Sequence, residues 1–503
     1  MMLHTSLAYF SVHQNRQYRA ACRKQAFAFQ VRRMFMKWLE QAHRMVWGPW
    51  TLGVFLGTGL FLTVKCRFFQ FRGFFFWWRS TVGSLFKSQD NDPCKKTQKN
   101  PPHSRETISQ FQSVCTALAA TVGTGNIAGV ATALTAGGPG ALFWMWVSAF
   151  IGMITAYAET SLGIRYRCRD AAGRFVCGPF LYMERGLNVP FLGILYSFLC
   201  LMCSLGMGSM VQANSAVSAV SFTWKLPLWL AGLIFAILTA AVIRGGIGRI
   251  GHVAERMVPA AAGIYIIFSL IVILSCLPVL PQVIKHILSS AFEFKAAAGG
   301  TAGFAVSRSL RYGIARGVFS NEAGLGTLAI LHGPAEHTTP HEQGMWAMFE
   351  VFFDTVILCT LTALVILCIT ETGGLGLEAI PYQGSALAAW AFKSRLGPGG
   401  EYLISASIAV FAFATVIAWF YLGKQAAAYL SSRRCLPGLF ADWLYPILFL
   451  TAVAAGSLIR SESVWLFSDL WNGLMAFPNL TALLFLSGEI SLPAGWRHPA
   501  SGD

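Results

Sequence analysis

The chain consists mainly of apolar runs that are about as long as a bilayer is thick. Roughly 20 apolar residues cross a hydrocarbon core. Such runs recur near residues 46–65, 109–134, 140–163, 191–220, 226–243, 257–280, 285–305, 312–331, 345–370, 402–423, 441–459 and 464–487. This pattern predicts an all-α polytopic membrane protein with about 11 or 12 transmembrane helices.

Composition excludes a water-soluble enzyme. Apolar residues make up 55% of the chain and charged residues 12%, whereas soluble domains carry about 25% charged residues. The 49 glycines and 16 tryptophans also fit a membrane protein, because glycine lets helices pack closely and tryptophan is common at membrane interfaces. We expect a multi-pass protein of a cell membrane, either the plasma membrane or the bacterial inner membrane.

The net charge of +16 comes from basic residues in short loops. The positive-inside rule explains this better than nucleic-acid binding, which would need a soluble basic domain. Four basic clusters stand at residues 65–105, 165–185, 244–256 and 308–316. Because two predicted spans separate each cluster from the next, we expect all four on the cytoplasmic side.

Two basic segments do not fit this count. Residues 1–45 form a basic N-terminal extension, and Lys424, Arg433 and Arg434 follow a late span. The count places both segments outside, against the positive-inside rule. Either the count is off by one span, or the extension is not a translocated loop, or translation starts at a later methionine.

Three histidines lie close together in the polar loop at residues 332–344, at His332, His337 and His341. The spacing suggests a metal site, but a solvated loop that faces outside is the better interpretation.

Two glycine-rich segments interrupt the apolar pattern, one at 116–140 and one at 291–326. Each glycine costs about 1 kcal/mol relative to alanine within a helix, so both segments should be weak helices. Unwound backbone at membrane depth is tolerated only where it is buried in protein or lines a cavity. A close-packing face of small residues explains the glycines equally well on physics alone.

A pair of broken segments is typical of transporters that are built from inverted repeats. Five predicted spans lie between residues 109 and 280 and five more between 285 and 459. We therefore expect a transporter domain at 46–490 that contains these two repeats.

Polar residues inside spans are functional candidates because burying them is costly. We interpret Glu159 as an interface carboxylate that pairs with Arg165 or Arg167. Asp354 has no nearby base in the sequence, so a functional role and a structural network are equally good explanations. Gln212 and Asn214 could bind either a neighbouring helix or a ligand.

Several long motifs resemble one family, the alanine or glycine:cation symporters, which are also called sodium:alanine symporters. The signature segment is GGPGALFWMWVSAFIG at 137–152, and ALAATVGTGNIAGVATAL at 117–134 precedes it. GSMVQANS at 208–215, GVFSNEAGLG at 317–326 and EVFFDTVILCTLTAL at 350–364 also look like the family. The resemblance runs from about residue 47 to 487. The sequence departs from the family pattern at Ala156, Cys177 and Phe180.

The resemblance implies a LeuT-like fold of two inverted five-helix units with an extra N-terminal span. It also implies import of alanine or glycine with sodium as the coupling ion, by alternating access and without an organic cofactor. A proton-coupled carrier of D-alanine or another small amino acid on the same fold is the alternative, with Asp354 or Glu322 titrating. We find no converging nucleophile or metal constellation, so a membrane enzyme is disfavoured.

The resemblance also implies where the ligands bind. The expected substrate contacts are Thr124, Gly125, Asn126, Gln212 and Asn321. The expected cation-binding or coupling residues are Gly123, Thr360, Thr362 and Asp354. Oxygen ligands of this kind suit a hard cation, and half-helix termini suit the charges of an amino acid.

Overall fold

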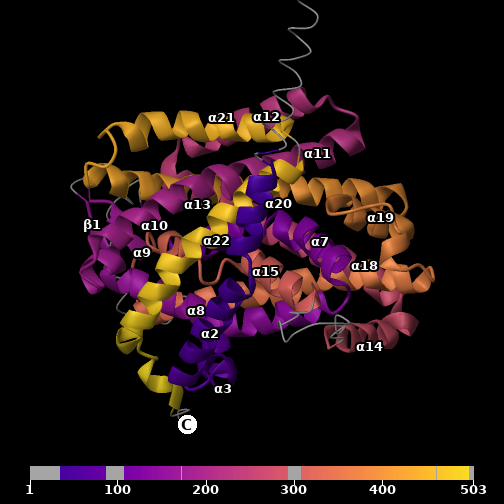
Figure 1. Ribbon diagram of the computed structural model, residues 1–503, viewed down its shortest axis with the longest axis horizontal. Coiled ribbons are helices and arrows are strands. Elements are labelled where there is room, and N and C mark those ends of the chain that lie inside the picture. Colours follow the sequence, from indigo (N-terminus) through magenta and orange to yellow (C-terminus); the bar gives the residue numbers. More distant parts are fainter. Residues whose placement is uncertain are drawn as a thin grey trace, which may run out of the picture.

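The computed structural model describes residue 34 and residues 36–85, 107–170, 173–292, 308–459 and 461–497. These residues are almost entirely helical, apart from a short antiparallel hairpin of β1 (Cys168–Arg169) and β2 (Phe175–Val176). Figure 1 shows α13, α20 and α21 running across the view. β1 and α9 lie at one end of these helices, and α14 and α19 lie at the other.

The helices follow the apolar runs. In the first half they are α2 (Pro49–Lys65), α3 (Phe69–Arg72), α4 (Phe74–Ser80), α5 (Val82–Leu85), α6 (Gln110–Thr121), α7 (Ala128–Gly137), α8 (Ala141–Tyr166), α9 (Pro179–Leu181), α10 (Pro190–Cys203), α11 (Gln212–Trp224), α12 (Leu228–Ile243), α13 (Gly246–Ser275) and α14 (Leu280–Ala291). In the second half they are α15 (Arg308–Asn321), α16 (Thr327–His332), α17 (Pro340–Val351), α18 (Thr360–Thr372), α19 (Ser385–Leu396), α20 (Pro398–Ser432), α21 (Tyr445–Leu458) and α22 (Ser461–Phe485).

Eight helices of the described chain are long and apolar enough to cross a membrane, and the bent pair α6–α7 makes a ninth. They are Met36–Lys65, Ala141–Tyr166, Pro190–Trp224, Gly246–Ser275, Pro340–Thr372, Pro398–Ser432, Phe440–Leu458 and Ser463–Glu489. The prediction of an all-helical multi-pass membrane protein is confirmed. The first span begins at Met36, inside the segment that we expected to be a separate extension.

Three of the predicted spans are not among these nine: two of them form shorter helices, and the third is not a span. The run at 226–243 forms α12, which is apolar but has 16 residues. The run at 312–331 divides into α15 and α16. The predicted span at 285–305 is wrong: α14 is a 12-residue helix that ends at Ala291, and residues 293–307 lie outside the described residues.

The pair α15–α16 runs antiparallel to the bent span α6–α7. The Ser309 hydroxyl, near the start of α15, donates to the carbonyl of Gly137 at the end of α7 (2.6 Å). The Ser113 hydroxyl, near the start of α6, donates to the carbonyl of Leu331 at the end of α16 (3.0 Å). We infer that α15–α16 crosses the membrane alongside α6–α7.

Without a span at 285–305, every loop after this segment lies on the opposite side of the membrane from the one that we predicted. The loop at 332–344 does not face outside, because Arg167 of a basic loop donates to the carbonyls of Gly333 (3.1 Å) and Ala335 (2.7 Å). Arg433 pairs with Glu184 and therefore also lies at the basic end. The cluster at 308–316 begins at the opposite end, where Ser309 contacts Gly137. One surplus span in the predicted count therefore explains why the loop at 332–344, the segment with Arg433 and the cluster at 308–316 were all assigned to the wrong side.

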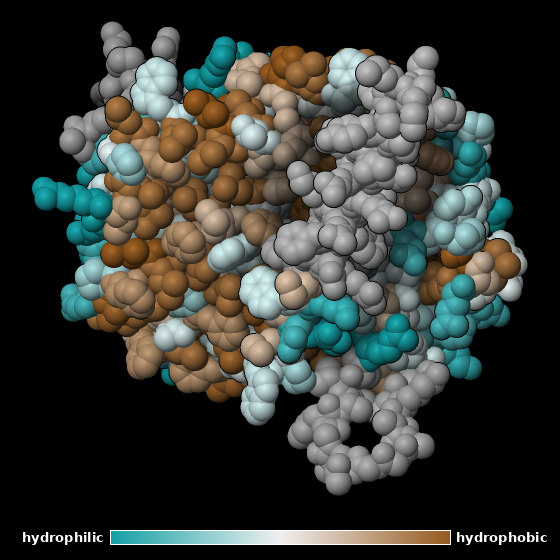
Figure 2. Space-filling model, turned by 45° about the horizontal axis from the view of Figure 1, so that its top comes forward, coloured by the Kyte–Doolittle hydropathy of each residue, from teal (hydrophilic) through white to brown (hydrophobic). Residues whose placement is uncertain are grey.

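The outer surface of the bundle is apolar. Figure 2 shows a broad hydrophobic area on the face that carries α21 and α12 in Figure 1, with hydrophilic residues at its edges. Trp229 and Ile237 of α12 and Ile447 of α21 are exposed. Soluble monomers rarely expose apolar patches of this extent, so we assign this face to the lipid.

The five-helix units can now be redrawn. We propose that the first repeat runs from α6 to α13 and the second from α15 to α22, with the span Met36–Lys65 as the extra helix. The second repeat then covers residues 308–489 rather than 285–459. Both repeats begin with a broken segment.

The corrected sidedness can be tested by cysteine labelling with a membrane-impermeant maleimide. His337→Cys should be labelled in inside-out vesicles and not in intact cells, and Arg308→Cys should show the reverse. Both substitutions are made in a protein in which serine replaces four native cysteines, Cys22, Cys94, Cys168 and Cys435. The first two lie outside the described residues, and the last two are not buried. Labelling of both sites from the same side would contradict the antiparallel crossing.

Candidate functional site

The break between α6 and α7 lies in the middle of the bundle. α6 ends at Thr121 and α7 starts at Ala128, with a short 3₁₀ turn (Thr124–Asn126) between them and a bend of 52°. The Asn126 side-chain oxygen accepts a hydrogen bond from the Gly123 amide (2.9 Å), which stabilises the unwound backbone. The glycine-rich segment is therefore a true interruption of the helix.

Gly123 is required because side chains approach its backbone closely. A Cβ at this position would lie 2.6 Å from the Thr415 hydroxyl and 3.3 Å from Gln212 Oε1. Gln212 Oε1 in turn accepts hydrogen bonds from the Thr124 hydroxyl (3.0 Å) and the Thr124 amide (3.3 Å). The break is thus surrounded by oxygen atoms from α11 and α20.

Two of the site residues stand in or directly after π-helical segments, which often mark functional sites in helices. The segment Ser204–Val211 ends immediately before Gln212, and the segment Phe352–Cys359 contains Asp354. Wider turns of this kind shift the side chains that follow them around the helix axis.

Asp354 is the central residue of the site. Its Oδ1 accepts a hydrogen bond from Asn126 Nδ2 (2.6 Å). Its Oδ2 accepts from the hydroxyls of Ser320 (2.8 Å) and Thr355 (3.0 Å). The carboxylate is fully buried, and in the described part of the chain it forms no ion pair. It connects the breaks of both repeats, because Asn126 belongs to the first break and Ser320 stands just before the second.

Two further hydroxyls converge on Asn126 from another side. Thr362 Oγ1 donates to the Asn126 carbonyl (2.7 Å), and the Tyr265 hydroxyl lies 2.6 Å from Thr362 Oγ1. Asn321 Nδ2 donates to Thr355 Oγ1 (3.1 Å), which places Asn321 in the same network. Carboxylate, carbonyl and hydroxyl oxygens of four spans, α6–α7, α13, α15 and Pro340–Thr372, therefore belong to one hydrogen-bonded network.

The second break, between Asn321 and Thr327, is held by buried protein groups. Glu159 Oε1 accepts from the Gly326 amide (3.2 Å) and from Asn479 Nδ2 (2.5 Å). Asn479 Nδ2 also reaches the Gly324 carbonyl (2.9 Å), and the Tyr196 hydroxyl donates to the Leu325 carbonyl (2.8 Å).

These contacts overturn the interpretation of Glu159 as an interface carboxylate. Glu159 is fully buried. Arg165 instead pairs with Glu489, and Arg167 binds loop carbonyls.

Aromatic and charged side chains cover the site from the outer end. A Cβ on Gly125 would lie 3.5 Å from the Phe319 ring, and Phe319 packs against Trp465 with ring centroids 5.2 Å apart. Beyond them Arg316 pairs with Asp469 (3.0 Å), which also lies 3.4 Å from His43 Nε2. The outer half of α15 is thereby tied to α22 and to the first span.

Eight of the nine predicted site residues belong to this group. The group contains Gly123, Thr124, Gly125, Asn126, Gln212, Asn321, Asp354 and Thr362. Thr360 does not belong to it, because its hydroxyl faces α8 and accepts from Trp146 Nε1 (2.7 Å). Asn214 does not belong to it either, since it donates to the carbonyls of Gly456 (2.9 Å) and Ile459 (2.8 Å).

The predicted site left out four residues that contact the group. Ser320, Thr355, Tyr265 and Thr415 supply its remaining hydroxyls. Ser320 is next to Asn321 in the motif GVFSNEAGLG, which could have suggested it. Tyr265 and Thr415 stand in ordinary apolar runs and carried no such signal.

The three histidines have separate partners. His332 is buried at the end of α16, where Nε2 lies 3.1 Å from Glu350 Oε2 and Nδ1 contacts Gln343. His341 Nδ1 lies 2.8 Å from the Tyr157 hydroxyl, while His337 is exposed. The expectation of one solvated loop is therefore wrong for His332.

Known proteins share both the sequence and the architecture. The model of the sodium:alanine symporter family matches residues 32–492. The sodium/alanine symporter AgcS of Methanococcus maripaludis is 38% identical over 464 residues, which cover 91% of this chain and 96% of that protein. The probable sodium/glutamine symporter GlnT of Bacillus subtilis is 33% identical over 446 residues, which cover 89% and 87%.

Among solved structures, the transporter MhsT in complex with L-phenylalanine matches with a TM-score of 0.55. Its sequence is 16% identical, and the match covers 77% of this chain and 91% of that one. This likeness shows the fold, which is LeuT-like as predicted. The chain is a membrane transporter, not an enzyme. It belongs to the sodium:alanine symporter family, which is a family of sodium-coupled amino-acid symporters.

Two neighbouring threonines offer a matched test of the site. Thr362→Ala removes the hydroxyl beside the Asn126 carbonyl, so the sodium concentration for half-maximal uptake should rise about tenfold, as expected when one buried polar contact is lost. Thr360→Ala removes a hydroxyl that faces Trp146 and should change this value less than about twofold. Equal effects of the two substitutions on sodium dependence would contradict the placement of the site.

Proposed function

We propose that the protein imports a small neutral amino acid, alanine or glycine, together with sodium by alternating access. One observation carries this proposal: unwound backbone of α6–α7 meets a buried carboxylate, Asp354, that also binds the second broken helix pair. In inverted-repeat transporters, such breaks hold both the substrate and the coupling ion.

The substrate half of the proposed site uses Thr124, Gly125, Asn126, Gln212 and Asn321. Helix N-termini favour negative charge and C-termini favour positive charge. The start of α7 therefore suits the carboxylate of an amino acid, and the end of α6 suits its ammonium group.

The site favours a small substrate. A Cβ on Gly125 would already contact the Ser320 Cα at 3.4 Å and the Phe319 ring at 3.5 Å. These are ordinary packing distances, so protein atoms already occupy the space beside Gly125. We propose a small substrate, alanine or glycine, rather than one with a long side chain such as that of glutamine.

The cation half of the proposed site uses Asp354, Thr362 and the backbone at Gly123 and Asn126. Sodium is a hard cation that binds oxygen, and unwound carbonyls in broken membrane helices coordinate it. Ser320 adds a hydroxyl beside the carboxylate. Thr360 leaves the proposal, because it faces α8.

Proton coupling is the second candidate, and the surroundings of Asp354 motivate it. A buried carboxylate without a basic partner is costly to keep charged, so it must gain either a cation or a proton. Glu322 is a second buried carboxylate, which accepts a hydrogen bond from Trp419 Nε1 (2.9 Å). On this alternative, D-alanine or another small amino acid would enter with a proton.

Alternating access requires the contacts between α15 and α22 that cover the site from outside to open. Substrate entry from outside requires Phe319 to separate from Trp465 and Arg316 from Asp469. Both contacts join α15 to α22, and the breaks beside them can absorb the required change of angle.

Uptake into proteoliposomes decides between the two coupling ions. An inward sodium gradient should drive accumulation of radiolabelled alanine at pH 6 and at pH 8, and a potassium gradient should not. Asp354→Asn removes the only charge that touches the proposed cation site in the described structure, so it should lower uptake by at least about 100-fold. Accumulation that a pH gradient drives without sodium would replace sodium by protons, and no accumulation under either gradient would reject the substrate class.

Substrate contact by Gln212 predicts a specific kinetic change. Gln212→Ala should raise the apparent Km for alanine about tenfold, which corresponds to the loss of a buried hydrogen bond. Asn214→Ala, two residues further on, removes contacts to the end of α21 and should leave the apparent Km within about twofold. Initial-rate measurements, normalised to the amount of protein in the membrane, check both values. An unchanged Km in Gln212→Ala would remove this residue from the site.

A further inference from the structure

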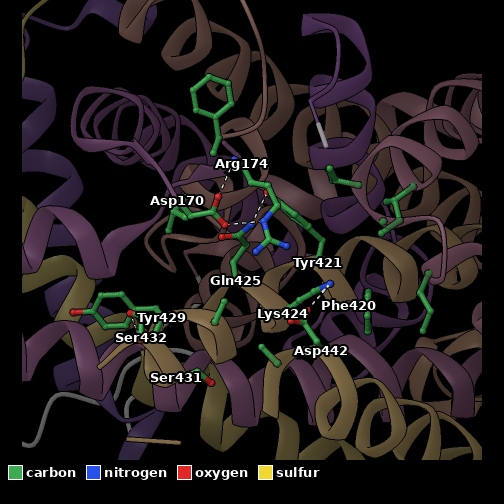
Figure 3. Close-up of a pocket in the computed structure, with 18 of the residues that line it drawn as sticks. Asp170, Arg174, Phe420, Tyr421, Lys424, Gln425, Tyr429, Ser431, Ser432 and Asp442 are labelled. Carbon is green, nitrogen blue, oxygen red and sulfur yellow. Dashed lines mark hydrogen bonds and ion pairs between the residues drawn. The ribbon is translucent and has the colours of Figure 1, made fainter. Parts of the chain in front are cut away.

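A cavity of about 980 Å³ opens at the basic end of the bundle. Its walls come from the hairpin β1–β2, the turn between α12 and α13, the last part of α20 and the segment before α21. Figure 3 shows Arg174, Lys424, Gln425 and Tyr421 around it. α6, α7, α15 and α16 contribute none of its lining residues, and no residue named above for the candidate transport site lines it.

The lining is strongly basic. It contains two acidic residues, Asp170 and Asp442, against six basic ones, which are Arg174, Arg185, Arg244, Arg249, Lys424 and Arg433. Three of these cations have acidic partners. Arg174 Nε donates to Asp170 Oδ2 (2.7 Å), Lys424 Nζ lies 3.3 Å from Asp442 Oδ1, and Arg433 pairs with Glu184. The first two pairs are drawn in Figure 3.

The other three arginines, Arg185, Arg244 and Arg249, form no ion pair with another residue in the described ranges of the chain. They stand on two different walls of the cavity. Guanidinium groups bind phosphate oxygens bidentately, which makes arginine the preferred side chain for such anions. Three exposed guanidinium groups around one cavity therefore indicate a multiply charged anion rather than a zwitterionic amino acid.

The start of α13 adds backbone donors to the same cavity. Gly246 and Gly248, in the first turn of this 30-residue helix, line it beside Arg249. Free amides at a helix N-terminus favour bound phosphate, and the first turn of α13 lines the same cavity as the arginines.

The rim of the cavity points to the membrane as the source of the anion. Leu439 and Trp443 flank the lining residues Ala441 and Asp442, and their side chains are 71% and 70% exposed. Exposed tryptophan is typical of the headgroup region. The apolar face of α21, which we assigned to lipid, begins directly beyond them.

We propose that this pocket binds a phosphate group, and that the headgroup of an anionic phospholipid of the cytoplasmic leaflet supplies it. Arg185, Arg244 and Arg249 hold the phosphate, and the acyl chains lie along α21. Basic residues near this leaflet attract anionic lipids. The proposal does not depend on the identity of the transported substrate.

Native mass spectrometry of the delipidated full-length protein, titrated with lipid, tests the proposal. The wild type should retain phosphatidylglycerol at least about tenfold more strongly than phosphatidylcholine. The triple variant Arg185→Gln/Arg244→Gln/Arg249→Gln should lose this preference, with roughly 100-fold weaker retention. Thermal unfolding with each lipid gives a second readout, because a ligand of the folded state raises its melting temperature.

A matched control removes the same charge from the same end of the bundle. Arg67, Arg72 and Arg79 are exposed and lie outside the cavity, so Arg67→Gln/Arg72→Gln/Arg79→Gln should retain the lipid like the wild type. The single change Arg244→Gln is the milder second variant and should give an intermediate loss. The helical circular dichroism spectrum and a monodisperse elution profile serve as the check that each variant is folded.

A parallel titration with inorganic pyrophosphate separates the two sources of phosphate. Stabilisation by phosphatidylglycerol that the pocket variant loses and the control keeps supports the lipid. Stabilisation by pyrophosphate alone, lost in the same variant, would keep the phosphate site but overturn the lipid as its source. Equal behaviour of the two triple variants, or no preference for anionic lipid or pyrophosphate, would overturn the proposal.

Discussion

The buried carboxylate of Asp354 is the interaction on which the rest of the site depends. It accepts hydrogen bonds from Asn126 at the first break and from Ser320 beside the second, so one acid joins the two inverted halves. A carboxylate at this depth is costly without a compensating positive charge. The arrangement is therefore suited to a cation. On the proposed function, binding of that cation would change the contacts of both broken helices at once.

The two breaks differ in what holds them. Buried protein groups from α8, α10 and α22 hold the backbone between α15 and α16. The backbone between α6 and α7 is instead surrounded by the polar groups of the proposed site. We infer from this asymmetry that the two breaks have different roles. The second break is a hinge that buried protein groups hold against α8, and the first break binds the ligands.

The sequence predicted the architecture and most of the residues that meet around Asp354, and its errors have physical causes. Hydropathy located the long spans, and glycines beside Asn126 located the first break. The surplus span at 285–305 arose because the alanine- and glycine-rich run at 296–305 follows the end of α14 and resembles a membrane segment. This error inverted the predicted side of the loop at 332–344. Hydropathy does not show which side chains bind each other across the fold. Glu159 was therefore assigned to arginines nearby in the sequence rather than to Asn479, which is 320 residues away. Thr360 and Thr362 looked equivalent, but two residues along a helix turn a side chain to a different face.

Calorimetric binding to the purified protein tests the central claim, that one site around Asp354 holds cation and amino acid together. If both ligands share this site, sodium must raise the affinity for alanine, and alanine must raise the affinity for sodium by the same factor. We predict a reciprocal gain of about tenfold or more, which Asp354→Asn abolishes. Alanine binding with the same affinity in sodium and in potassium would contradict the account.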